Sequence, residues 1–216
     1  MSRAASVDEE SYAPTRRDFV AGAGAVIGLC AVGGIGVATA GDELLRPPGG
    51  QSESAFIARC TRCDRCRSAC PTGVIAPANL EDGLVNIRTP KLNFKLGWCN
   101  FCGACADVCA TGAITNLRGE AFTAEGFSGR TFYETSGQLG VAHINEDRCI
   151  IWSGQSTCKL CSQYCPYGAI TLDELERPVI DANLCTGCGA CEYNCPSSRL
   201  LSYEGDKTRG IEVGRA

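Results

Sequence analysis

The chain has 216 residues, of which 17 are cysteine and one, His143, is histidine, and its formal net charge at pH 7 is −4. This length allows one ordinary domain or two small ones, and so many thiols are typical of a disulfide scaffold or a metal-rich fold. The charge balance argues against nucleic acid as the main partner, and a single histidine leaves little material for histidine-based acid–base chemistry or zinc catalysis.

Residues 1–40 carry the features of an export signal. Arg16 and Arg17 precede a stretch, residues 19–40, that has no charged residue and is rich in Gly, Ala and Val. The paired arginines resemble those of a twin-arginine (Tat) signal, which directs folded proteins to export, and an Ala-Thr-Ala sequence allows cleavage after Ala40. The alternative is an uncleaved anchor, because such a stretch is long enough to span a bilayer of about 30 Å.

Residues 41–54 contain two prolines followed by two glycines and are predicted to be a linker.

Four cysteine runs, each a group of four closely spaced cysteines, follow the linker, and only Cys30, inside the export signal, lies outside them. Thiols separated by two, two and three residues and followed by proline form the bacterial ferredoxin motif for [4Fe–4S] clusters. The second run has Ala110 in place of the proline, and the first gap of the third run is stretched to eight residues, from Cys149 to Cys158.

The sequence around the runs is also repeated. The first three runs continue as CPTGVI, CATGAI and CPYGAI, which predicts a turn into a short strand, and Ile144 and Ile180 predict strands ahead of the last two runs. Each unit is therefore expected to be a strand, a cluster loop, a short helix and a strand, which is half of a ferredoxin. We predict an α+β fold of tandem two-cluster ferredoxin-like lobes, in which the fourth cysteine of each run ligates the partner's cluster.

Spacing favours pairing neighbouring runs, because the interval from Cys109 to Cys149 is the longest and is rich in Gly, Ser and Thr. The predicted lobes are residues 55–118 and 141–204, with a linker or insert at 119–140 and a tail at 205–216. The predicted ligand sets are Cys60, Cys63, Cys66 and Cys109 for the first cluster; Cys99, Cys102, Cys105 and Cys70 for the second; Cys149, Cys158, Cys161 and Cys195 for the third; and Cys185, Cys188, Cys191 and Cys165 for the fourth. A nested scheme, pairing run one with four and two with three, stays open.

Disulfide and zinc interpretations fit these cysteines less well. Disulfides need no repeated spacing, and zinc sites use two separated CxxC pairs rather than four regular runs. The arginines within and beside the first run either tune its cluster or bind an acidic partner, or form a solvated loop; they are Arg59, Arg62, Arg65 and Arg67. Aromatic residues beside cysteines either shield clusters from water or pack in the core, and His143 is expected to be a strand residue.

The order of these features resembles the MauM/NapG family of exported ferredoxin-type proteins. The residues that carry the resemblance are TRRDF at 15–19, RTPKLNFKLGWCNFCGAC at 88–105, and the stretched run CIIWSGQSTCKLCSQYCP at 149–166. The resemblance implies an electron carrier on the periplasmic, outer side of the membrane, working beside a membrane-bound quinol-oxidising polyferredoxin and feeding a periplasmic reductase or other redox enzyme. Ala110 stands where the pattern has proline, so the sequence does not predict where the helix before it ends.

The leading hypothesis is a one-electron relay with four [4Fe–4S] clusters and no catalytic residue of its own. An alternative is an electron-transfer subunit bound tightly to a molybdenum oxidoreductase. A second alternative is an enzyme whose special cluster lies at the irregular third run, which requires that Cys149 is not a ligand.

Overall fold

The computed structural model describes residues 44–124, 126–127, 129–154, 157–197 and 208–215, together with Arg16, Gly22, Gly24, Ala25 and Gly28. Residues 1–41 and 42–216 form two compact units. Arg16 is helical and exposed, whereas Arg17, Cys30 and Ala40 lie outside the described residues. Within the described part of the chain, no helix is both long enough and apolar enough to cross a membrane.

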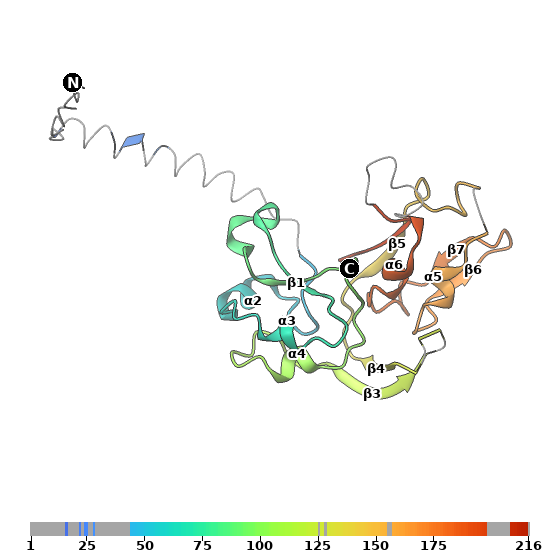
Figure 1. The fold of residues 1–216 in the computed structure, drawn as a ribbon, viewed down its shortest axis with the longest axis horizontal. Coiled ribbons are helices and arrows are strands. Elements are labelled where there is room, and N and C mark those ends of the chain that lie inside the picture. The colour runs from blue at the N-terminus through green and yellow to red at the C-terminus, as the bar shows by residue number, and fades with distance from the viewer. Residues whose placement is uncertain are drawn as a thin grey trace, which may run out of the picture. The chain divides into compact units, whose positions relative to one another are not determined.

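The second unit contains short helices that carry or precede the cysteine runs (Figure 1). They are α2 (Glu53–Arg59), α3 (Arg65–Ala69), α4 (Ala104–Asp107), α5 (Leu160–Gln163) and α6 (Ala190–Asn194), with two 3-10 turns, η1 (Leu80–Asp82) and η2 (Leu84–Asn86). Each of the last four α-helices carries one cysteine in its interior or first turn. The helices are short because they only have to present that cysteine.

The strands form four two-stranded antiparallel sheets among the described residues. The pairs are β1 (Ile75–Pro77) with β2 (Pro90–Leu92), β3 (Arg118–Thr123) with β4 (Thr131–Thr135), β5 (Val141–Ile144) with β8 (Ile211–Gly214), and β6 (Ile170–Leu172) with β7 (Pro178–Ile180). The strands predicted at Ile144 and Ile180 are confirmed. This mixture of small helices and strands fits a ferredoxin-like fold.

The pattern after the second run does not lead into a strand, so that prediction is wrong. Ala113 and Ile114 are buried, but the next strand begins only at Arg118. The Thr115 hydroxyl instead donates a hydrogen bond to the Gly49 carbonyl, at 3.3 Å. The neighbouring segment contains Pro47 and Pro48, which have no backbone N–H to donate, so a regular ladder cannot form there.

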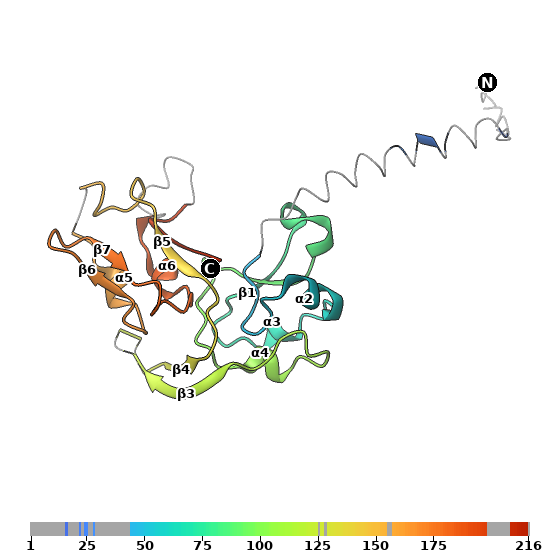
Figure 2. The same cartoon turned by 180° about the vertical axis from the view of Figure 1, so that it is seen from behind.

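The segment 119–140, predicted as a linker or insert, holds the β3–β4 hairpin. In both Figure 1 and Figure 2 this hairpin runs along one edge, beside the elements of both predicted lobes. Phe127 lies between the two strands and Phe132 lies in β4; both are buried, and their rings pack edge to face with centroids 4.7 Å apart. Phe127 also contacts Trp98 at 5.3 Å and Tyr164 at 5.4 Å. The hairpin therefore supplies core side chains as well as a connection.

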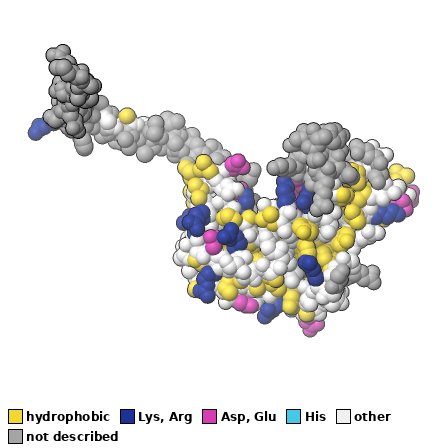
Figure 3. Space-filling view, in the orientation of Figure 1, with side chains coloured by type: hydrophobic (Ala, Val, Ile, Leu, Met, Phe, Trp, Pro, Cys, Tyr) yellow, Lys and Arg dark blue, Asp and Glu magenta, His cyan; other side chains and the backbone are white. Residues whose placement is uncertain are grey.

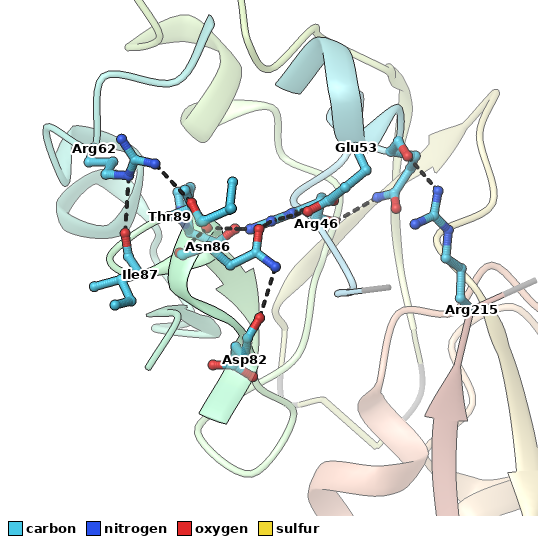
Figure 4. A network of polar contacts seen from close by, with 11 residues as sticks. Arg46, Glu53, Arg62, Asp82, Asn86, Ile87, Thr89 and Arg215 are labelled. Carbon is cyan, nitrogen blue, oxygen red and sulfur yellow. Dashed lines mark hydrogen bonds and ion pairs between the residues drawn. The ribbon is translucent and has the colours of Figure 1, made fainter. Parts of the chain in front are cut away.

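The segment before α2, predicted as a linker, is anchored by the buried side chain of Arg46 (Figure 4). Its guanidinium donates to both carboxylate oxygens of Glu53, to Thr89 Oγ1 at 2.7 Å, to the Pro90 carbonyl at 3.0 Å and to Asn86 Oδ1 at 3.0 Å. All five N–H donors of the side chain are thereby used. The segment is consequently part of the core, and its composition did not reveal this.

The predicted tail, residues 205–216, contains β8 and is also part of the fold. Ile211 and Val213 are buried, and Ala142 of β5 lies opposite Val213. The Val213 N–H donates to the carboxylate of Glu192, a buried residue of α6, at 2.9 Å. His143 is an exposed strand residue opposite Glu212, as expected.

Candidate metal centres

Three of the four cysteine loops share an unusual backbone conformation. The residues just before and just after the second cysteine have positive φ: Arg62 and Asp64 in the first run, Phe101 and Gly103 in the second, and Gly187 and Gly189 in the fourth. Alternation of this kind turns successive backbone N–H groups toward one point and is a common way to bind iron–sulfur clusters. The loop geometry therefore follows from the spacing of the cysteines, and glycine is not required for it.

Glycine is nevertheless needed in the fourth run, because neighbouring chain packs directly against it. A Cβ on Gly187 would lie 2.4 Å from the Gly140 nitrogen, and one on Gly189 would lie 1.9 Å from Phe94 Cδ1. These two glycines therefore allow close packing against residues far away in the chain.

The fourth cysteine of every run makes the same backbone hydrogen bond. The N–H groups of Cys70, Cys109, Cys165 and Cys195 each donate to the carbonyl three residues earlier, at 3.0–3.3 Å. The second run does this without a following proline, so Ala110 leaves the geometry at Cys109 unchanged. The thiol spacing, more than Pro, sets where these short helices end.

The structure brings sixteen cysteines together around four cavities, each lined by four thiols. Site 1 has Cys60, Cys63, Cys66 and Cys109; site 2 has Cys70, Cys99, Cys102 and Cys105; site 3 has Cys149, Cys158, Cys161 and Cys195; site 4 has Cys165, Cys185, Cys188 and Cys191. These are the sets grouped by spacing for neighbouring runs. Cys195 lies with the third run, where a nested arrangement would have placed it with the first.

The chemistry of the cavities fits an iron–sulfur cluster. All sixteen cysteines are free thiols. Among the described residues, no group of three or more Cys, His, Asp or Glu side chains is arranged to hold a single metal ion. A tetrahedral zinc site would require four ligands within about 2.3 Å of one point, whereas thiols spread around a cavity suit a larger metal cluster.

Burial makes free thiolates unfavourable inside these cavities. Desolvation raises the pKa of Cys66 to about 11, and that of Cys105, Cys161 and Cys188 to about 12. The negative charges of neighbouring thiolates contribute to these raised values. Four thiolates gathered in one cavity therefore need a positively charged group between them, and the iron of a cluster would supply that charge.

Several hydrogen-bond donors lie next to the fourth cysteines. The hydroxyls of Thr72 and Ser197 contact the sulfurs of Cys70 at 3.4 Å and Cys195 at 3.1 Å, two residues before them. The Ala169 N–H donates to the Cys165 sulfur at 3.2 Å. Donors to cluster sulfurs stabilise the reduced, more negative state and so raise the reduction potential.

The four sites differ in exposure. Among the sixteen cysteines, Cys63 of site 1 is the exposed one, and the backbone N–H of Arg65 lowers its pKa. The buried ones belong to sites 2 and 4; they are Cys99, Cys105, Cys188 and Cys191. The aromatic residues beside the cysteines also differ in exposure: Trp98 and Phe101 are buried, whereas Tyr193 is exposed.

Sequence reasoning missed two residues that support the sites. Arg46 stacks on Phe56, with its guanidinium carbon 4.8 Å from the ring centroid, and Phe56 lines site 1. Glu192 lies beside Cys191 and holds β8 through the Val213 N–H. Arg46 also bonds to Asn86 and Thr89, and Glu192 bonds to Val213, all more than twenty residues away, so no local pattern marks either residue.

The third run lacks the positive-φ pair. Lys159, between Cys158 and Cys161, has φ −122°, and the chain enters α5 directly. The stretched part begins with a turn in which the Ser153 N–H donates to the Cys149 carbonyl at 2.9 Å. Cys149 still reaches the same cavity as Cys158 and Cys161, which a regular gap of two residues would ordinarily ensure.

Comparison with known proteins agrees with this chemistry. Two models described as a 4Fe-4S dicluster domain match residues 59–114 and 156–198. The chain is 32% identical to the methylamine utilization ferredoxin-type protein MauM of Methylophilus methylotrophus over 75% of this chain and 72% of that protein. It is 34% identical to the ferredoxin-type protein NapG of Escherichia coli K12, over 83% and 78%, and 31% identical to NapF of the same strain, over 73% and 84%.

Proposed function

Because the chain belongs to the MauM/NapG family of ferredoxin-type proteins, we propose that it is an exported electron carrier with four [4Fe–4S] clusters. The observation that carries this proposal is the set of four cavities, each lined by four thiols. In this proposal residues 55–118 and 141–204 are tandem two-cluster lobes, and residues 211–214 complete the second. When bound, each cluster accepts and donates one electron.

The ligand count supports electron transfer rather than catalysis. A cluster that binds substrate needs an iron with an open coordination position, and four thiolates leave none. The chain's own residues then have three tasks, which are to ligate, to tune the reduction potential and to exclude water. The hydroxyls beside Cys70 and Cys195 serve the second task, and the buried rings of Trp98 and Phe101 serve the third.

Export by the Tat route is part of the proposal. Arg16 and Arg17, the uncharged stretch that follows and the cleavage site after Ala40 support it. An exported protein with this many thiols would otherwise form disulfides. Folding in the reducing cytoplasm, before export, allows the clusters to be inserted first, and the carrier would then work on the periplasmic face of the membrane.

We propose a membrane-bound quinol-oxidising polyferredoxin as the electron donor and a periplasmic reductase or dehydrogenase as the other partner. The relationship to a methylamine utilization protein supports a redox enzyme as partner. Exposed arginines around site 1, namely Arg59, Arg62, Arg65, Arg67 and Arg88, favour an acidic surface on one of the partners. Figure 3 shows Lys and Arg side chains gathered over the region of α2 and α3.

Metal analysis of anaerobically purified protein tests the proposal. Four clusters require about sixteen iron and sixteen sulfide per chain. Half that content would contradict four clusters, and zinc in place of iron would contradict the whole proposal. Electron paramagnetic resonance (EPR) of the reduced protein should show cubane signals that are lost one site at a time when ligand cysteines are replaced.

Two further experiments address the alternatives. Stable co-purification of a large catalytic subunit would favour a permanent subunit of a molybdenum oxidoreductase. Replacement of Cys149 by Ser should remove the site 3 cluster, because Cys149 lines that cavity. Four intact clusters in this variant, with substrate turnover by the protein alone, would instead favour an enzyme with one special cluster.

A further inference from the structure

The arrangement of the four cysteine cavities defines a path through the molecule. We propose that they form a single file in the order site 1, site 2, site 4, site 3, so that sites 1 and 3 are the ends and sites 2 and 4 the inner pair. This inference rests on the proposed function, because the path carries electrons only if each site holds a cluster. It differs from the order of the cysteine runs along the chain.

The first step joins sites 1 and 2. Helix α3 carries Cys66 of site 1, helix α4 carries Cys105 of site 2, and the two helices pack against each other. Each site also takes its fourth cysteine from the other run, since Cys109 follows α4 and lines site 1, and Cys70 follows α3 and lines site 2. The two cavities are therefore neighbours.

The last step joins sites 4 and 3 in the same way. Helix α5 carries Cys161 of site 3, helix α6 carries Cys191 of site 4, and these helices also pack together. Each of these sites also takes its fourth cysteine from the other run, Cys195 at site 3 and Cys165 at site 4. The third run is irregular in sequence, but its helix packs against that of the fourth run as the helix of the first run packs against that of the second. Sites 3 and 4 are therefore neighbours.

The middle step joins sites 2 and 4. The Cys99 N–H donates to the Cys188 carbonyl at 2.8 Å, so a ligand of site 2 is bonded directly to a ligand of site 4. Both cysteines are buried, and the rings of Trp98 and Tyr193 lie 5.1 Å apart beside them. The close contact of Gly189 with Phe94 belongs to the same junction. The described contacts include no corresponding bond from a cysteine of site 1 to one of site 3.

Exposure agrees with this order. The buried cysteines belong to the inner sites, and the exposed Cys63 belongs to an end site. One electron would enter at one end from a donor protein and leave at the other end to an acceptor protein. No bond forms or breaks, and every site returns to its starting oxidation state. The stretched loop of the third run then lies at an end of the path, where a partner protein can contact it.

Two matched variants distinguish the proposed order from the chain order. Cys149→Ala and Cys185→Ala each remove the first cysteine of a run, from site 3 and site 4 respectively, and both residues are half-buried. Each loaded variant should keep three clusters, about twelve iron per chain. In EPR of the fully reduced proteins, Cys185→Ala should show one cluster without magnetic coupling, because site 3 has lost its neighbour. Cys149→Ala should show none.

The opposite result, an uncoupled cluster in Cys149→Ala and none in Cys185→Ala, would support the chain order and overturn the proposal. If either variant loses more than one cluster, the iron positions in a crystal of the loaded native protein decide the question. Anomalous scattering should place site 2 between sites 1 and 4, and site 4 between sites 2 and 3. Any other order overturns the single file, whereas a native protein without iron overturns the proposed function itself.

Discussion

The N-terminal part of the cluster-bearing unit, residues 44–118, and its C-terminal part, residues 141–215, close their outer edges by different means. In the C-terminal part, β8 pairs with β5 over four residues. In the N-terminal part, residues 44–52 precede the first run as β5 precedes the third. They form no strand and are held by the side chain of Arg46. The comparison shows that the cluster loops require a closed edge but do not prescribe how it is closed.

The two solutions respond differently to sequence change. A strand pair uses backbone hydrogen bonds, which tolerate most side chains. A buried arginine depends on particular partners, and a partner that is lost leaves a charge uncompensated inside the protein. We therefore expect single substitutions to damage the N-terminal edge more severely than the C-terminal edge.

Removal of iron should have the largest effect and should abolish the difference between the two parts. Cysteines line every cavity and contribute to the core of both, so without clusters the buried thiols lose their main stabilising contact. We expect the apoprotein to lose cooperative unfolding and to become sensitive to proteases throughout residues 44–215. Circular dichroism and limited proteolysis before and after chelation test this. An apoprotein that retains one resistant part would show that the edges alone can support a fold.

Arg46→Met should be the most damaging single change to the N-terminal edge. It leaves Glu53, Asn86 and Thr89 without their cation, and loss of one partner of a buried pair typically costs about 3–5 kcal/mol. We expect hydrogen exchange to rise in residues 44–118 while residues 141–215 remain protected. Denaturation followed by cluster absorbance should also occur at a lower denaturant concentration.

Arg88→Met is the matched control in the same part of the chain. The Arg88 side chain is 66% exposed and pairs with Asp64 at 3.4 Å. Exposed pairs of this kind contribute about 0–1 kcal/mol. Equal effects of the two substitutions would mean that Arg46 does not close the edge.

Val213→Pro tests the C-terminal edge and should cost about 3 kcal/mol. Proline cannot donate the hydrogen bond that Glu192 accepts from the Val213 N–H, and its ring disturbs the pairing of β8 with β5. Exchange should now rise in residues 141–215. Val213→Ala keeps the N–H and should cost only about 1 kcal/mol. A proline variant no worse than the alanine variant would show that β8 is not needed to close this edge.

The sequence predicted best what depends on local spacing. The cysteine runs, their mixed surroundings of short helices and strands, and the strands at Ile144 and Ile180 all follow from patterns within about ten residues. The cavities also group the cysteines as the intervals between runs suggested. Spacing is informative here because a cluster loop leaves few conformations open to the residues between its ligands.

Long-range contacts are what the sequence did not reveal. Arg46 meets Asn86 forty residues away, and Arg215 donates to the Gln51 carbonyl across 164 residues. Phe127 and Phe132 lie in a segment whose glycines and threonines indicated a linker. Each of these residues is ordinary in its local context, and only the tertiary structure shows which distant residues it contacts.

The smallest expected effect concerns a position that the two parts share, the residue after the second cysteine of a run. Asp64 in the first run and Gly189 in the fourth both have positive φ, at 61° and 76°. The left-handed conformation costs about 1–2 kcal/mol for residues other than glycine, less for Asp. Asp64→Gly relieves this cost but also removes ion pairs with Arg67 and Arg88, at 3.9 and 3.4 Å, which contribute little because they are exposed. The expected net gain is therefore about 0.5 kcal/mol.

Asp64→Ala separates the two contributions, because it removes the same ion pairs and keeps the backbone cost. We expect Asp64→Gly to raise, and Asp64→Ala to lower, the denaturant concentration at which cluster absorbance is lost. The difference between the two variants should be about 1 kcal/mol, the conformational preference of glycine for positive φ. If both variants are destabilised equally, the ion pairs decide the stability of this loop. The first run would then be held by its side chains, and the fourth by the glycine backbone that packs against Phe94.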